Sequence, residues 1–275
     1  MTALELHALK ETGRFERLCA LLEIADETPG QSGRIVFGGA SQGIILVQSG
    51  RVCWAASPAM GTRLSHRLWQ NASVDDGRLA EVFRECRESG KPFGQTLVAR
   101  GIVTFDALRT ALLQHTAEAL IHLAGGRSPR WVPGHVDRYD RELTFPSVEL
   151  LAHAADGWWG PLASEARSEL AEALGERGAT GLAFLRDAEM DDAIVPVGIV
   201  GAGELSAREV LAAGRAAAAL MRSGDPIGGR LITATAAGGR TAVVWLNRGT
   251  YYVAIAAERS EIAFIVAHVS RRPAD

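Results

Sequence analysis

Lysine is almost missing from this 275-residue chain, in which Lys10 and Lys91 are the only two. Any chemistry that needs a lysine amine therefore has two candidates. Cysteine is scarce as well: Cys19, Cys53 and Cys86 are odd in number, lie far apart and have no CxxC spacing. This pattern excludes a disulfide framework and predicts reduced thiols.

The chain also has little net charge and no long apolar run. Its formal net charge of −3 provides no excess of positive charge to attract nucleic acid or anionic lipid. No segment approaches about 18 continuous apolar residues, and the start has no apolar run of signal-peptide length. With 47% hydrophobic and 22% charged residues the composition is globular. We predict a cytoplasmic protein with neither a nucleic-acid nor a membrane partner.

A catalytic motif is matched only superficially. Residues 39–43 fit G-x-S-x-G, with Ser41 in the nucleophile position. A nucleophile elbow needs a helix after the serine, whereas Ile44 to Val47 is apolar and β-branched. The same stretch resembles the phosphate loop of short-chain dehydrogenases, but Ile45 stands where a glycine should open a helix. A hairpin turn is the favoured interpretation, and a hydrolase at Ser41 is retained only as a third hypothesis.

No metal or cofactor site is predicted. His115 and His122 are seven residues apart on one helix face, yet no acidic or thiol ligand lies near them in sequence. We therefore expect a packed or solvated pair of histidines. The chain is predicted to have no catalytic residue, no metal ligand and no cofactor.

The first half of the chain predicts a helix followed by a small sheet. Residues 14–24 form an amphipathic pattern typical of a short helix. Three β-rich runs follow at 34–39, 43–48 and 51–56, and Ser49-Gly50 is a plausible hairpin turn. These runs predict an antiparallel meander.

An internal repeat with an offset of 29 residues comes next. Residues 63–86 align with residues 92–115. The apolar pairs are Leu64 with Phe93, Leu68 with Leu97, Leu79 with Leu108, and Phe83 with Leu112. Each copy predicts a short helix, a turn and a second helix, with Ser73 or Thr104 as the cap. The leucine faces must be buried on each other or on the meander.

The repeat is similar to the tandem motif R-L-G-x-x-L-x-x-x-G in the N-terminal domains of pilus and type II secretion ATPases, some of which bind cyclic-di-GMP. The motif arginine is kept only as Arg63, since Pro92 replaces it in the second copy. Cys86 and His115 stand where that family has glutamines. The favoured interpretation is a structural scaffold. The alternative is a ligand-sensing module that binds a cyclic dinucleotide through the repeat.

Together the meander and the repeat resemble a PATAN domain, the N-terminal domain of PatA-like response regulators. The resemblance covers about residues 10–156 and rests on pattern. The segment 156–161, DGWWGP, predicts a boundary because a proline follows two tryptophans and a glycine. We therefore predict one domain over 1–156 and a second over 161–275.

The second half alternates helices and strands. A helix is predicted over 162–176, followed by two strands, a helix, three strands and a final short helix. The strand runs are GLAFLRD, AIVPVGIVG, RLITATAA, TAVVWLN and YYVAIAAE.

The helix over 206–222 is the most distinctive of these elements. Ser206 and Glu209 form a capping box at its start. Alanine and glycine fill most of the helix, which lets another backbone approach closely. Arg208, Arg215 and Arg222 recur every seventh residue and share one narrow stripe. The stripe is either a solvated edge or a docking face for an acidic partner.

This element order resembles the Roadblock/dynein light chain family over about residues 161–272. The resemblance implies a small α/β domain that dimerises through its second helix and third strand, and bacterial members commonly accompany Ras-like GTPases. We predict an α+β protein whose N-terminal domain joins a β-meander to a helical tandem repeat. The C-terminal domain is predicted to be Roadblock-like, with a five-stranded antiparallel sheet. The predicted homodimer interface comprises Val210, Ala213, Gly214, Ala217, Leu231, Thr233 and Thr235.

The resulting hypothesis is a non-enzymatic cytoplasmic signalling scaffold. It would homodimerise through the Roadblock-like domain and bind protein partners, including a Ras-like small GTPase.

Overall fold

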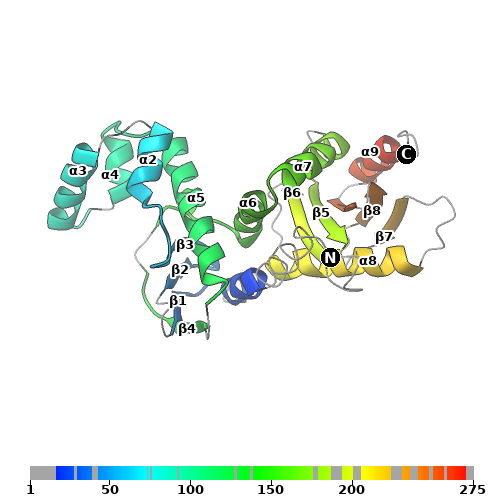
Figure 1. Cartoon of the computed structure of the whole chain (residues 1–275), viewed down its shortest axis with the longest axis horizontal. Helices are drawn as coiled ribbons and strands as arrows, with labels where there is room; N and C mark the ends of the chain where they lie inside the picture. The colour runs from blue at the N-terminus through cyan, green and yellow to red at the C-terminus, as the bar shows by residue number, and fades with distance from the viewer. Residues whose placement is uncertain are drawn as a thin grey trace. The chain divides into compact units, whose positions relative to one another are not determined.

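The structure is a computed structural model, and it describes residues 17–27, 30–38, 43–72, 74, 76–91, 93–126, 129–136, 139–175, 179–186, 194–200, 206–223, 231–235, 241–247, 250–256 and 259–270. The chain is a mixed α+β protein with antiparallel sheets, as predicted (Figure 1). It divides into two compact units, one comprising residues 27–145 and the other residues 1–26 with 146–275. This division differs from the predicted domains 1–156 and 161–275. None of the described helices has the length and hydropathy needed to cross a membrane.

The unit 27–145 contains a four-stranded antiparallel sheet. Its strands are β1 (Ser32–Phe37), β2 (Ile44–Gln48), β3 (Arg51–Ala56) and β4 (Pro129–Pro133), in the order β3-β2-β1-β4. The predicted meander is confirmed. At the β2–β3 turn Ser49 has a φ of 53° and Gly50 a φ of 77°. Two consecutive positive φ angles suit the twist of a tight hairpin, so the Ser49-Gly50 turn is also confirmed.

Strand β4 is an edge strand that the sequence pattern does not predict. Both of its ends are prolines, which lack the N–H that a central strand needs. It pairs with β1, where Gly33 faces Pro133. A Cβ atom on Gly33 would lie 2.6 Å from the carbonyl oxygen of Val132, so this pairing requires glycine.

Four helices of the same unit form the predicted repeat. The first copy provides α2 (Leu64–Ala72) and α3 (Asp76–Ser89), and the second provides α4 (Phe93–Ala99) and α5 (Phe105–Leu123). Thr104 caps α5 because its Oγ1 accepts a hydrogen bond from the Ala107 amide at 3.2 Å. The predicted cap Ser73 lies outside the described residues. The repeat's apolar residues form one buried cluster, which includes Leu68, Leu79, Leu97, Leu108 and Leu143 from the short 3-10 helix η1 (Arg141–Leu143).

The other unit is built on a five-stranded antiparallel sheet. Its strands are β5 (Thr180–Arg186), β6 (Ile194–Val200), β7 (Leu231–Thr235), β8 (Thr241–Asn247) and β9 (Thr250–Ala256), in the order β6-β5-β9-β8-β7. Helices α7 (Pro161–Leu174) and α9 (Arg259–Ser270) lie on one face of the sheet, and α8 (Ala207–Ser223) lies on the other (Figure 1). Helix α6 (Ser147–Trp159) packs beside α7 and β6, and a further helix spans residues 17–26.

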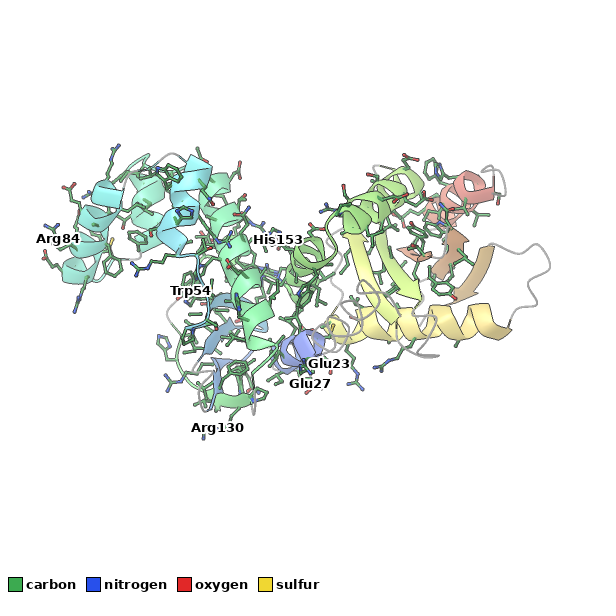
Figure 2. The ribbon with its side chains drawn as sticks, viewed as in Figure 1. Glu23, Glu27, Trp54, Arg84, Arg130 and His153 are labelled. Carbon is green, nitrogen blue, oxygen red and sulfur yellow. The ribbon has the colours of Figure 1, made fainter. Side chains whose placement is uncertain are left out.

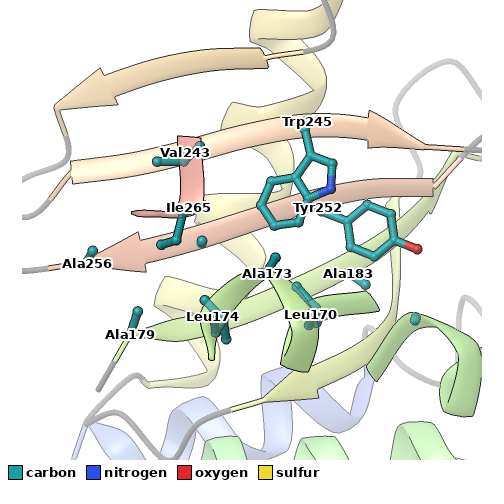
Figure 3. Close-up of a cluster of buried hydrophobic side chains, with 12 residues drawn as sticks. Leu170, Ala173, Leu174, Ala179, Ala183, Val243, Trp245, Tyr252, Ala256 and Ile265 are labelled. Atoms are coloured by element: carbon teal, nitrogen blue, oxygen red, sulfur yellow. The ribbon is translucent and has the colours of Figure 1, made fainter. Parts of the chain in front are cut away.

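The core of this unit lies between the sheet and the α7–α9 layer. Trp245 and Tyr252 stack on neighbouring strands with ring centroids 5.2 Å apart. Leu170 of α7 and Ile265 of α9 are fully buried in the same cluster (Figure 3). Beneath α7 the backbone of Gly181 is closely covered, since an added Cβ would lie 2.9 Å from Leu170 and from Leu174. The apolar residues of these elements therefore form a core between a layer of helices and the sheet.

Candidate functional site

Two places in the chain have the features of a binding site, and they lie in different units. The first is formed by β7 and α8, the elements predicted to form a dimer interface. The second is a cavity within residues 27–145. Each is described separately below.

Strand β7 lies at one edge of the five-stranded sheet. It pairs with β8, and no described strand pairs with its other side. An uncovered edge exposes a row of amide and carbonyl groups to which another strand can pair. The side chains of Leu231, Thr233 and Thr235 lie outside the part of the chain that the structure describes.

Helix α8 begins with the predicted capping box. The Ser206 amide donates to Glu209 Oε2 at 2.8 Å, and Ser206 Oγ accepts from the Glu209 amide at 3.2 Å. A third free amide at this helix start, that of Ala207, donates to Asp26 Oδ2 at 2.8 Å. Ser147 Oγ of α6 donates to the other oxygen of Asp26 at 2.6 Å. Asp26 therefore links the helix 17–26 to the starts of α6 and α8.

No pattern in the sequence predicts the contacts of Asp26. It is 121 residues from Ser147 and 181 from Ala207, so only the fold brings the three together. Burial raises the pKa of the Asp26 carboxyl, while the hydrogen bonds from Ser147 and Ala207 oppose that rise. The positive end of the α8 dipole is a favourable place for the carboxylate. These contacts give Asp26 a structural role.

The side of α8 that packs on its own sheet carries two residues that were predicted to lie at the dimer interface. Val210 is fully buried within the single chain. Gly214 is also buried, and an added Cβ would lie 2.6 Å from the ring of Phe184 on β5. Neither residue is therefore accessible to a second copy in this structure, because Val210 is fully buried and Gly214 lies against Phe184. Ala213 is half-buried, and the side chain of Ala217 is not among those described.

The opposite side of α8 is exposed. Arg208 and Arg215 are both exposed and share one face, as the spacing of seven residues predicts. Ala212, Ala216 and Ala219 are exposed as well. The side chain of Arg222, the third predicted member of the stripe, lies outside the described part of the chain. The stripe is thus accessible at its two described positions.

The cavity in residues 27–145 has a volume of about 1410 Å³. It opens between the sheet and the helical repeat and is lined from both sides. The sheet provides Leu46, Cys53 and Trp54, and the helices provide Leu64, Leu79, Phe83, Phe93, Leu108 and Leu112. Most of its lining is therefore apolar.

The residues that line the cavity range from fully buried to exposed. Cys53 and Leu108 are each only 1% exposed, whereas Phe83 at the outer side is 57% exposed. Phe83 and Phe93 meet edge to face with centroids 5.7 Å apart. Burial raises the pKa of the Cys53 thiol to about 12, so this thiol is protonated at neutral pH and is a poor nucleophile.

Two cations and one acid line the same cavity. Arg63 and Lys91 are exposed and form no ion pair with any other described residue. Asp140 Oδ1 is occupied by the Glu142 amide at 3.1 Å, where it caps η1. The polar side chains of the lining thus favour an anion. Arg63 is the arginine that the repeat motif retains, whereas no pattern in the sequence predicts that Lys91 lines the same cavity.

His115 of α5 stacks on Trp54 of β3, and Trp54 is labelled in Figure 2. The two rings stack with centroids 4.3 Å apart and an interplanar angle of 26°. His115 is 6% exposed, and neither ring nitrogen has a hydrogen-bond partner among the described residues. The prediction of a packed histidine is confirmed for His115. Burial, aided by the nearby Arg67, lowers the pKa of its imidazole.

One earlier candidate lies outside the described residues. Ser41 and the rest of the loop 39–42 lie among the residues that are not described, although a strand does follow them, as predicted. The three cysteines are all buried, and none forms a disulfide with another described residue, in agreement with the prediction.

Comparison with known proteins provides no further identification. No family model matches this chain, and no curated protein or solved structure matches it either. The resemblances to PATAN and Roadblock domains therefore rest on sequence pattern and element order.

Proposed function

We propose that the chain is a non-enzymatic signalling scaffold that homodimerises through its C-terminal, Roadblock-like unit and binds protein partners. The observation that carries the proposal is the position of β7 at an edge of the sheet. Pairing of β7 with its copy across a two-fold axis would cover both edges and produce one continuous sheet. The order helix, two strands, helix, three strands, helix supports the likeness to Roadblock domains.

Because Val210 and Gly214 are buried within one chain, we propose that α8 contacts a second copy through another of its sides. With Val210 and Gly214 on the sheet, Ala213 and Ala216 form a neighbouring flank of small residues. Arg208 and Arg215 lie on a different flank, so the helix can contact a second copy while its arginines stay accessible. We retain Ala213, Leu231, Thr233 and Thr235 as the proposed interface and add Ala216 from the same flank. Ala217 is not retained, because its spacing of seven residues assigns it to the same side of the helix as Val210.

The first experiment measures the mass of the purified protein by light scattering at micromolar concentration. We expect a dimer, and Ala216→Glu should convert it to a monomer because a buried, unpaired carboxylate is costly. Ala171→Glu on α7 is the matched control, since it places the same charge on an exposed alanine of the opposite layer. A monomeric native protein, or equal behaviour of the two variants, contradicts this mode of dimerisation.

The exposed arginines suggest where a partner binds. A guanidinium makes bidentate contacts to carboxylates, so the Arg208 and Arg215 face suits an acidic protein surface such as that of a Ras-like small GTPase. Arg208→Glu with Arg215→Glu should leave the dimer and its melting temperature nearly unchanged. The variant should lose binding to the GTPase, and binding of the native protein should weaken as salt rises. Full binding by the double variant would move recognition elsewhere.

Cyclic-dinucleotide binding through the repeat is the second candidate function. It is supported by one observation, the presence of the motif residue Arg63 in the cavity lining. A nucleotide that binds only the folded state must raise the melting temperature in a concentration-dependent way. We rank this candidate second because most of the lining is apolar.

A further inference from the structure

We propose that the cavity in residues 27–145 binds a single-chain amphiphile with an anionic headgroup, such as a long-chain carboxylate. The proposal concerns the small-molecule ligand of this unit and is independent of dimerisation. It follows from the shape of the cavity, the chemistry of its lining and the position of its charges.

The cavity leads from the surface into the interior. It extends from the exposed Phe83 on α3 to Cys53 on β3, which is buried. It therefore passes between the helical repeat and the sheet. An alkyl chain that enters beside Phe83 would leave water as it passes towards Cys53.

The lining favours an apolar body. Leu79, Leu108 and Leu143 are nearly fully buried, and Trp54 and Phe93 add aromatic surface. Each methylene of a bound chain that leaves water gains roughly 0.8 kcal/mol. Two added methylenes should therefore tighten binding by about tenfold for as long as the chain remains inside the cavity.

The charges favour an anionic head at the exposed end. Arg63 and Lys91 both line the cavity and are exposed, while Asp140 already accepts a hydrogen bond at the start of η1. A carboxylate beside either cation would stay hydrated while its chain enters the apolar part. Because both cations are exposed, their effect on affinity is modest and sensitive to salt.

The experiment is calorimetric titration of the full chain with octanoate, decanoate and dodecanoate below their micellar concentrations. We expect saturable binding with one site per chain and an affinity that rises about tenfold per two methylenes. Dodecanol provides the same chain without the charge and should bind more weakly. Absence of saturable binding, or affinity independent of chain length, overturns the proposal.

Variants locate the binding site. Arg63→Gln with Lys91→Gln should weaken dodecanoate binding about fivefold and leave dodecanol binding unchanged. Arg84→Gln with Arg87→Gln is the matched control, because both arginines are exposed on α3 and do not line the cavity (Arg84 is labelled in Figure 2). Equal effects of the two pairs would assign binding to general surface charge and overturn the site.

A fluorescence-quenching assay tests how deeply the ligand enters the cavity. It is informative even where a variant does not change the affinity. Dodecanoate with bromine on its terminal carbon should quench tryptophan fluorescence, and Trp54→Phe should remove that quenching while the other tryptophans remain. Quenching that persists in Trp54→Phe overturns the assignment. Displacement of dodecanoate by cyclic-di-GMP, with no effect of chain length, would instead assign the cavity to a nucleotide.

A free fatty acid and a lysophospholipid are both single-chain anionic amphiphiles, and a parallel titration with lysophosphatidylglycerol distinguishes them. Binding of dodecanoate together with lysophosphatidylglycerol supports the proposal with a lysophospholipid as the source. Binding of dodecanoate without lysophosphatidylglycerol binding supports it with a free fatty acid as the source.

Discussion

Asp26 is a single residue on which three segments depend. Its two oxygens accept from Ser147 Oγ and from the Ala207 amide, and Ser147 is only 2% exposed. Asp26→Ala would leave both donors without their partner, and we expect the free energy of unfolding to fall by about 1–3 kcal/mol. Ser147→Ala removes one of the two contacts and should cost less. Urea unfolding measures both, and a smaller loss in Asp26→Ala than in Ser147→Ala would contradict the linking role.

His115 gives the chain a predicted dependence on pH. Burial lowers the pKa of its imidazole below the ordinary 6.5, so the unfolded chain binds this proton more tightly than the folded chain does. The free energy of unfolding should therefore fall as the pH drops below 6.5 towards the folded-state pKa. His115→Phe keeps a ring against Trp54 and removes the titrating group.

The measurement for His115 is a set of chemical unfolding curves between pH 7.5 and pH 5. The native protein should lose stability towards the acidic end, and His115→Phe should show a smaller loss. His122→Phe on the same helix is the control and should behave like the native protein. Identical slopes in all three proteins would show that His115 does not titrate in the expected direction.

At the scale of elements, α8 depends on the absence of a side chain at Gly214. A Cβ atom there would lie 2.6 Å from Phe184, closer than ordinary packing allows. We expect Gly214→Ala to lower the free energy of unfolding by about 1–3 kcal/mol, although alanine is the better helix former. Ala212→Gly, at an exposed position of the same helix, reports the cost of helix propensity alone. Adding Phe184→Leu to Gly214→Ala should recover part of the loss, and no recovery would contradict the steric explanation.

Most elements could be predicted because their signals are local. β-rich runs separated by turn residues predicted β1 to β3, and the Ser206–Glu209 box predicted the start of α8. Strand β4 was missed because its two prolines indicate a turn, and only its edge position makes them acceptable. The final helix, predicted as short, has twelve residues.

The candidate sites could be predicted only in part. An alanine-rich helix does not indicate which side it buries, so the burial of Val210 and Gly214 within one chain was not predicted. The stripe of arginines was recognised because its spacing is local. The cavity and Asp26 both depend on residues far apart in sequence, such as Cys53 with Leu108, and no local pattern reports such contacts.

At the scale of the whole molecule, the two units differ in how the chain builds them. Residues 27–145 are continuous, whereas the other unit combines residues 1–26 with 146–275. The helix 17–26 contributes Leu18 and Leu22, which are 0% and 1% exposed. A C-terminal fragment that starts at residue 161 lacks this helix and α6 as well.

These connections predict how fragments of the chain behave. The fragment 27–145 keeps its sheet, its repeat and the buried cluster around Leu68, so it should fold alone and melt in one cooperative transition. The fragment 161–275 loses the Asp26 contact with the Ala207 amide and the packing of α6 on α7 and β6. A polypeptide in which residues 1–26 are joined by a flexible linker to residues 146–275 restores both. Near-ultraviolet circular dichroism should show fixed tertiary structure in the joined polypeptide and a weaker, less cooperative signal in 161–275. An equally cooperative transition for 161–275 would mean that the second unit is complete without the N-terminal helix, and that the originally predicted boundary describes the folding units better.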